Sequence, residues 1–320
     1  MNAAAAAQRA LDAKTKPRGS LGRLEELAVR VAGIRGTAAP GRLRAVVVVA
    51  AADHGVAAEG VSAYPAEVTR QMLANFETGG AAVSVLARAA RADVYVVDAG
   101  VGTPTGNIAL GPAMQREDAA AWIERGIACA HELAADGVGI VALGEMGIGN
   151  STSAAALAAA LLGVDAEQVC GRGTGLDDTA LAHKVDVVRS ALRRNRTDDP
   201  VETLAALGGY ELAFLAGVAL GAAARSVVIL LDGFISSTAA LVAARIEPAA
   251  VDAMIAAHLS PEPGHRIVLD ALGLAPLLNL GLRLGEGSGA ALALPIVDAA
   301  LALLEEMATF VDAGVTDAGR

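Results

Sequence analysis

The chain has 320 residues, of which 54% are hydrophobic and only 2% aromatic, and its formal net charge is −10 at pH 7. A chain of this length can bury a substantial core without staples. Its two cysteines, Cys129 and Cys170, lie in unrelated segments, so we expect no disulfide framework, no zinc site and a reducing, cytoplasmic location. The acidic balance, the dispersed Lys and Arg residues and the few aromatic rings argue against nucleic acid as a partner.

Five apolar runs, taken in chain order, predict strands that are buried on both faces. They cover residues 43–52, 92–98, 137–143, 226–232 and 253–258. Helical patterns alternate with them at 65–91, 117–135, 151–162, 178–193, 209–224 and 234–246. This alternation is typical of right-handed βαβ units. The sequence therefore predicts an α/β protein with a Rossmann-like, mainly parallel sheet flanked by helices.

The five runs end in polar residues or glycine, namely Asp53, Asp98, Gly144, Asp232 and His258. Because the carboxyl ends of parallel strands meet at one edge of a sheet, we expect these residues to gather there. Ligands bind at that edge in open α/β folds. The sequence thus places a candidate site at the carboxyl edge.

The two ends of the chain differ from its middle, because residues 2–33 and 288–311 show helical patterns without strands between them. We expect a Rossmann-like catalytic domain over 34–287 and a small helical subdomain built from 1–33 and 288–320. The stretch 146–164 carries no charge, but its first half is typical of a loop and a helix start. The N-terminal alanine run lacks the pattern of an export signal. We therefore expect no membrane partner.

Two similar loops each set a glutamate among glycines between an apolar run and an alanine-rich helical pattern. They are Leu-Gly-Glu-Met-Gly-Ile-Gly-Asn-Ser-Thr at 143–152 and Leu-Gly-Glu-Gly-Ser-Gly at 284–289. A carboxylate placed in this way presents charge to a ligand, so we expect an active site here. The helix start at Gly149-Asn150-Ser151 suits an anion, phosphate above all. An ordinary capped helix start explains the same residues equally well.

Two further segments carry weaker signals. The loop 171–178, Gly-Arg-Gly-Thr-Gly-Leu-Asp-Asp, could hold a phosphate together with Lys184, although a capped turn beside a solvated lysine is the interpretation that composition favours. Asp53-His54 fits a turn with a hydrogen-bonded side chain better than a catalytic dyad. The chain shows no serine elbow and no cysteine in a nucleophile context, so acyl transfer lacks support.

Six ordered segments resemble one family, the nicotinate-nucleotide:dimethylbenzimidazole phosphoribosyltransferases of cobalamin biosynthesis. These segments cover residues 16–28, 52–69, 144–157, 171–178, 230–237 and 280–296, almost from end to end. The resemblance implies transfer of the 5-phosphoribosyl group from nicotinate mononucleotide to 5,6-dimethylbenzimidazole by a Rossmann-type homodimer that needs no metal and no cofactor. The chain departs from the family in a short connection at 99–106 and in Arg18, where a proline is common. Both departures bear on the dimer contact or the rim of the base site.

The resemblance also implies roles for individual residues. It assigns the general base to Glu286 and places Glu145 beside the nucleotide. The residues that it implies around the nucleotide and its phosphate are Glu145, Gly147, Ile148, Gly149, Asn150, Ser151, Thr152, Gly173, Thr174, Gly175, Lys184, Asp232 and Gly233. The residues that it implies around the incoming base are Ser62, Tyr64, Gln71, Met72 and Leu284.

The implied reaction requires one general base and no general acid, since the leaving pyridinium departs as a neutral ring. The β substrate and the α product favour one displacement with inversion. Without the resemblance, a helix-start carboxylate that satisfies free N–H groups is the favoured interpretation of Glu286. Two alternatives stay open: the same transfer to adenine, another benzimidazole or a phenol, and a nucleotide-binding protein without turnover.

Overall fold

A parallel sheet forms the centre of the protein in the computed structural model, which describes residues 2–173, 175–194 and 197–316. The strands lie in the order β2-β1-β3-β4-β5. Their bounds are Arg44–Ala51 for β1, Asp93–Asp98 for β2, Val138–Met146 for β3, Val228–Leu231 for β4 and Met254–Ala256 for β5. Every pair of neighbouring strands runs parallel. The predicted Rossmann-like α/β fold is therefore confirmed.

The strand order changes direction at β1, because β1 pairs with β2 on one side and with β3 on the other. Ala51 at the end of β1 is in register with Met146 at the end of β3. The ends of these two strands therefore lie side by side at the carboxyl edge. Such a switch in strand order marks the ligand site of open α/β sheets.

Two apolar clusters cover the two faces of the sheet. Val46 and Val48 of β1 belong to one cluster, whereas Val47 and Val49 belong to the other, as the alternation of side chains along a strand requires. The helices of the first cluster are α5 (Arg116–Ala135), α6 (Asn150–Leu162), α7 (Ala166–Val169), α8 (Asp178–Arg194), α9 (Pro200–Leu207), α10 (Tyr210–Ala224), α11 (Phe234–Ile246) and α12 (Pro263–Leu272). Those of the second are α1 (Ala3–Asp12), α2 (Arg23–Arg35), α3 (Glu67–Glu77), α4 (Ala82–Ala89) and α13 (Ser288–Glu306).

One predicted helix is two helices in the structure. The pattern over 65–91 is divided between α3 and α4, because Gly79 adopts a left-handed φ of +73° and Ala81 is extended. A helix cannot continue through such a backbone. The remaining short elements are η1 (Gly55–Glu59), η2 (Pro248–Ala253) and α14 (Phe310–Ala313).

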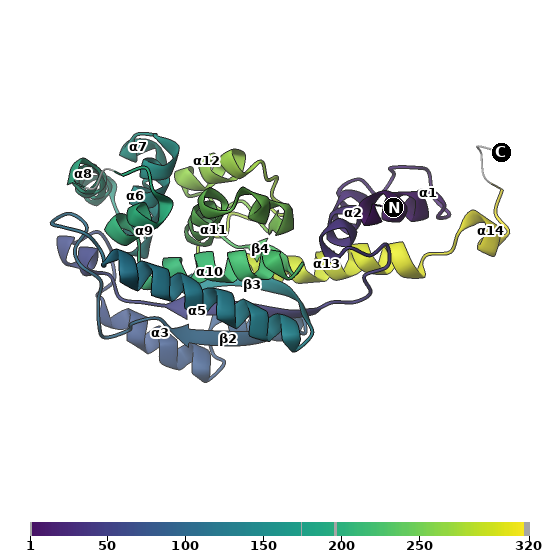
Figure 1. The fold of residues 1–320 in the computed structure, drawn as a ribbon, viewed down its shortest axis with the longest axis horizontal. Coiled ribbons are helices and arrows are strands. Elements are labelled where there is room, and N and C mark those ends of the chain that lie inside the picture. The colour runs from purple at the N-terminus through teal and green to yellow at the C-terminus, as the bar shows by residue number, and fades with distance from the viewer. Residues whose placement is uncertain (1, 174, 195–196, 317–320) are drawn as a thin grey trace.

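The two ends of the chain lie side by side. Phe310 N–H donates to Ala13 O at 3.1 Å, and Lys14 Nζ donates to Met307 O at 2.6 Å. Figure 1 shows α1 and α2 beside the far half of α13, at the end of the molecule opposite α8. Leu27 of α2 nevertheless shares a core cluster with the sheet. The division into 34–287 and a terminal subdomain stays a prediction.

Helix α13 lies on the sheet and on α2. Within the described residues it is the helix that is long and apolar enough to cross a membrane, and 56% of its apolar window is buried in the protein. Ala290, Leu294 and Leu301 of this helix belong to the core cluster on its face of the sheet. Its apolar character is therefore used in packing.

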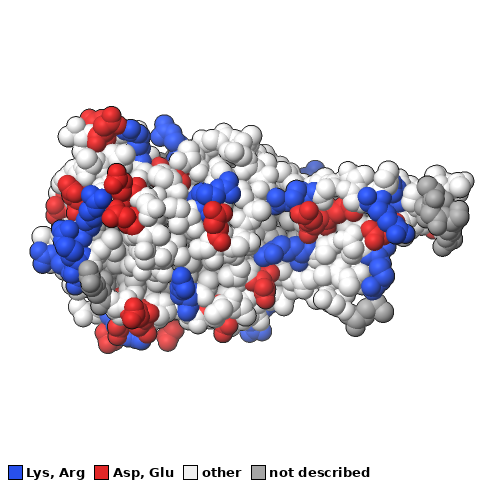
Figure 2. Space-filling view, turned by 90° about the horizontal axis from the view of Figure 1, so that it is seen from above, with Lys and Arg blue, Asp and Glu red and all other residues white. Residues whose placement is uncertain are grey.

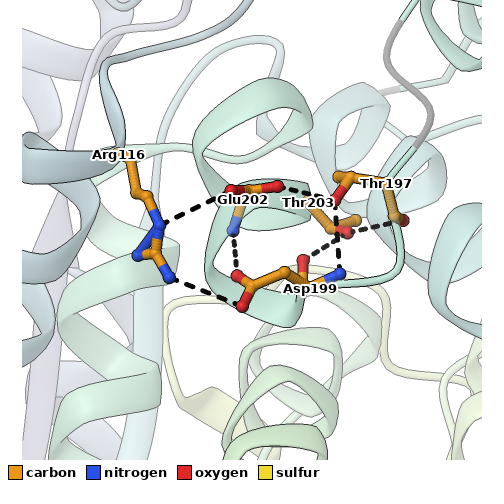
Figure 3. A network of polar contacts seen from close by, with 5 residues as sticks. All are labelled: Arg116, Thr197, Asp199, Glu202 and Thr203. Atoms are coloured by element: carbon orange, nitrogen blue, oxygen red, sulfur yellow. Dashed lines mark hydrogen bonds and ion pairs between the residues drawn. The ribbon is translucent and has the colours of Figure 1, made fainter.

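A polar network joins the starts of α5 and α9 (Figure 3). Asp199 caps α9 by accepting the Glu202 N–H at 2.8 Å, and Arg116 of α5 forms ion pairs with both carboxylates. Because these side chains are half exposed, each pair contributes at most about 1 kcal/mol. The network anchors the segment that leads through α9 to Glu211.

Charged side chains of both signs are mixed on the surface. On the face shown in Figure 2, Lys and Arg side chains lie among Asp and Glu side chains. Arg189, for example, pairs with Asp165 at 3.0 Å and with Glu167 at 3.3 Å.

Candidate active site

The first Gly-Glu loop connects β3 to α6 at the carboxyl edge. Glu145, near the end of β3, is buried, and its Oε2 accepts a hydrogen bond from Asn150 Nδ2 at the start of α6. A side chain at Gly147 would place its Cβ 2.6 Å from Ala52 O, so the tight turn requires glycine. Gly149 is left-handed, with a φ of +98°. The loop thereby turns the α6 N-terminus back toward Glu145.

The second Gly-Glu loop leads into α13 and contacts the first. Glu286 is buried and left-handed, with a φ of +64°, between left-handed Gly285 and Gly287. A side chain at Gly285 would overlap Glu145 Oε1, and one at Gly144 would overlap the Glu286 carbonyl. The two loops therefore form neighbouring parts of one site.

Asp232, which follows β4, accepts hydrogen bonds from the second loop and the start of α13. Its Oδ2 accepts the Gly287 N–H at 3.2 Å, and its Oδ1 accepts the Ala290 N–H at 3.0 Å. His258 Nε2 lies 3.4 Å from Oδ1. Gly233 is the N-cap of α11 and is half buried. Asp232 thus links the ends of β4 and β5 to the start of α13.

Burial and like charges raise the pKa of the glutamates. Burial, followed by the charge of Asp232, raises the pKa of Glu145 to about 8, although the hydrogen bond from Asn150 opposes this change. Burial also raises the pKa of Glu286, with Asp232 adding to it and the backbone N–H of Val83 opposing it. Glu286 Oε2 is buried and has no hydrogen-bond partner in the described structure. A raised pKa and an oxygen without a partner suit the Glu286 carboxylate to accept a proton.

Lys184 on α8 is buried, so the solvated lysine that composition favoured is wrong. Its Nζ donates to Ser151 Oγ at 2.9 Å and to Gly171 O at 3.1 Å. Burial lowers the pKa of Lys184, and the charge of Glu262 opposes that change. Lys184 therefore brings a cation to the start of α6, beside Gly173, as an anion site requires.

Further residues predicted to bind the nucleotide lie in the first loop, in the first turn of α6 and in the loop before α8. Ile148 N–H donates to Thr69 Oγ1 at 3.1 Å, which ties the first loop to α3, and Thr152 is fully buried in the first turn of α6. Gly175 is exposed, with a φ of +112°. Thr174 lies outside the described residues.

The predicted base-binding residues lie near the surface around α3 and the second loop. Ser62 and Tyr64 precede α3, and Gln71 and Met72 lie on it. The side chains of Tyr64 and Leu284 are 55% and 56% exposed. Their contact with the incoming base stays a prediction.

Sequence reasoning missed a buried cluster under the first loop. His54 Nε2 contacts Glu211 Oε1 at 2.7 Å, and its Nδ1 contacts Ser153 Oγ at 3.0 Å. His54 is thus a hydrogen-bonded side chain, as the sequence indicated, and its carboxylate partner is Glu211 on α10. Asp53 accepts the Gly102 N–H at 2.7 Å instead. Glu211 stands out as the only charged residue of α10, and this was the available signal.

Glu262 is a second missed residue, since its Oε1 accepts the Gly173 N–H at 3.0 Å. Its partner loop lies 89 positions away in the sequence. Among the described residues, no group of three or more His, Cys, Asp or Glu side chains is placed to hold a metal ion.

The fold and the site define an α/β protein in which a helix start with a buried lysine beside it adjoins two buried glutamates. Comparisons with known proteins give the family. A family model described as phosphoribosyltransferase matches residues 1–315. The nicotinate-nucleotide–dimethylbenzimidazole phosphoribosyltransferase of Chloroflexus aurantiacus is 51% identical, covering 98% of this chain and 95% of the relative. That of Halalkalibacterium halodurans is 52% identical over 96% and 91%.

A solved structure agrees with these relatives. The crystal structure of CobT from Thermus thermophilus superposes with a TM-score of 0.95 at 47% identity, over 99% of both chains. The chain therefore belongs to the nicotinate-nucleotide:dimethylbenzimidazole phosphoribosyltransferase family. The resemblance of its motifs is confirmed.

Proposed function

We propose that the protein transfers the 5-phosphoribosyl group of nicotinate mononucleotide to 5,6-dimethylbenzimidazole, giving α-ribazole 5′-phosphate and nicotinate. The observation that carries this proposal is the placement of Glu286, which has a buried oxygen without a partner among the described residues and whose backbone adjoins Gly144, next to Glu145. The names of the relatives supply the two substrates.

The chemistry of the substrates matches this arrangement. The ring nitrogen of nicotinate mononucleotide is a pyridinium, so the C1′–N bond breaks without protonation of the leaving group. The attacking nitrogen of dimethylbenzimidazole forms the new C1′–N bond while the other ring nitrogen loses its proton. Glu286 Oε2 accepts that proton. A positioned general base contributes about 10²–10⁴-fold to the rate.

The anionic groups of the nucleotide belong at the other side of the site. The start of α6, Lys184 and the Gly173 loop together offer a helix N-terminus, an ammonium group and a glycine backbone that a ligand can approach. Glu145 faces the ribose between these groups and Glu286. Attack from the Glu286 side and departure from the α6 side give a single displacement with inversion at C1′.

We also propose that the protein is a homodimer and that it lies in the cytoplasm. Exposed apolar side chains on the edge strand and on a helix that contacts it, Tyr95 of β2 and Val85 of α4, support a partner surface. Cys129 and Cys170 are free thiols, which fits a reducing compartment.

The direct test is incubation of the purified protein with nicotinate mononucleotide and dimethylbenzimidazole. We expect one equivalent of nicotinate and a product whose mass and anomeric NMR signal identify an α-riboside phosphate. A panel with adenine, other benzimidazoles and phenols ranks the acceptors. Binding of nicotinate mononucleotide without nicotinate release for any acceptor would establish the non-catalytic alternative.

A further inference from the structure

Asp232 is a buried carboxylate whose contacts point to a role beyond the nucleotide. We propose that Asp232 is a positioning residue for Glu286, because it fixes the start of α13 and thereby the loop that carries the base. This inference rests on the proposed function, since it assigns a task within that reaction.

The first support is that α13 has no cap of its own. Its N-cap residue is Gly287, which has no side chain to accept the free N–H groups of the first turn. Asp232, 55 positions earlier in the sequence, accepts the N–H groups of Gly287 and Ala290. The carboxylate that follows β4 therefore takes the place of the missing cap.

The second support is the backbone of Glu286. A left-handed φ of +64° is unfavourable for a residue with a Cβ, so neighbouring contacts must hold it. Asp232 fixes the next residue, Gly287, and Ser288 Oγ donates to Gly285 O at 2.7 Å on the other side. Asp232 thus acts directly on the peptide that orients the Glu286 side chain.

The third support is that Asp232 is itself held in place. His258 Nε2 lies 3.4 Å from Oδ1, and a side chain at Gly289 would overlap the His258 ring. The His258 ring packs 5.9 Å from that of His265, which contacts Ser237 Oγ at 3.1 Å. Contacts with the segments after β4 and β5 therefore hold Asp232 in place, and Asp232 in turn holds the loop that carries Glu286.

The charge of Asp232 gives the proposal a measurable signature. The ionisable groups that face Glu286 are Asp232 after β4, Glu145 on β3 and, behind Asp232, His258 after β5; α4 contributes the Val83 N–H. Asp232 raises the pKa of Glu286. Removal of its charge lowers that pKa, so the acid limb of the pH–kcat profile moves to lower pH.

The test compares Asp232→Asn with the wild type and with Asp298→Asn, a matched control on the outer side of α13 whose partner is Arg42. Turnover of the wild type is measured first, because an inactive wild type rejects the proposed function and not the positioning role. We expect Asp232→Asn to lose about 10–100-fold in kcat. Its Kd for nicotinate mononucleotide stays within about twofold, and its acid limb shifts to lower pH. The control keeps wild-type values.

A second variant, Asp232→Glu, separates position from charge. It keeps the negative charge but displaces the carboxylate, so we expect a lower kcat with the acid limb unmoved. Unchanged kcat and pH profile in a folded Asp232→Asn variant overturns the proposal. So does a loss confined to nicotinate mononucleotide affinity, which indicates a nucleotide contact. Failure of both variants to fold also overturns it, because Asp232 then has a purely structural role.

Discussion

Glu286 combines the properties that a general base needs in this reaction. Its side chain is buried, one oxygen has no hydrogen-bond partner among the described residues, and burial together with Asp232 raises its pKa. Its backbone is held in a left-handed conformation that only the surrounding loops can maintain. These properties arise from contacts between β3, β4 and the start of α13.

The sequence located both glutamates but not their partners. Glycines around a carboxylate after an apolar run are a local pattern, so Glu145 and Glu286 could be found without coordinates. Glu211 lies 157 positions from His54, and Glu262 lies 89 positions from Gly173. Contacts between residues so far apart in the sequence form only when the chain folds, so local sequence patterns do not reveal them.

Glu145 makes the stability of the protein dependent on pH. Its pKa is raised to about 8 in the folded state from an ordinary value of 4.5. Between these values the folded protein holds the proton and the unfolded chain does not, so stability falls as pH rises through this range. We expect Glu145→Gln to reduce the fall in Tm between pH 5 and 8 by on the order of 5 °C.

The control for this measurement is Glu124→Gln on the exposed side of α5. That variant should keep the wild-type dependence of Tm on pH. An equal slope for Glu145→Gln and the wild type in differential scanning calorimetry contradicts a raised pKa for Glu145.

At the scale of elements, the long buried strands could be predicted from the sequence, and the short helices could not. β1 and β3 are buried on both faces, so their sequences are continuous apolar stretches with a clear signal. The four residues of α7 and the ten of α12 begin with caps or prolines but lack a long periodic pattern. Gly79 and Gly80 mark the break between α3 and α4, which the helical period of 65–91 concealed.

The starts of α6 and α13 differ in their contacts. The α6 N-terminus faces Lys184, whereas the α13 N-terminus is taken up by Asp232. In the proposed function, Lys184 beside the α6 start faces the anionic substrate, whereas Asp232 occupies the α13 start and holds the loop of the proposed base. The similar glycine patterns of the two loops gave no sign of this difference.

At the scale of the molecule, the change in strand order between β1 and β3 places the site. The sequence could predict the carboxyl edge, because the polar residues after the strands are visible in it. The order of the strands in the sheet could be learned only from the structure. The terminal helices meet along α13, at the end of the molecule opposite α8 (Figure 1).

A homodimer is the expected state of the whole molecule in solution. The chain has a mass of 31.9 kDa, and its exposed apolar side chains include Tyr95 and Leu280. We expect light scattering to give about twice the chain mass at micromolar concentration. A mass equal to that of one chain over the whole concentration range contradicts the dimer.

The kcat of Glu286→Gln tests most directly whether Glu286 accepts the proton of the attacking base. Glu306→Gln, at the exposed far end of α13, is the matched control. We expect Glu286→Gln to fold, to bind nicotinate mononucleotide with nearly unchanged affinity and to lose about 10²–10⁴-fold in kcat, while the control stays active. Near-normal turnover by folded Glu286→Gln would contradict the account.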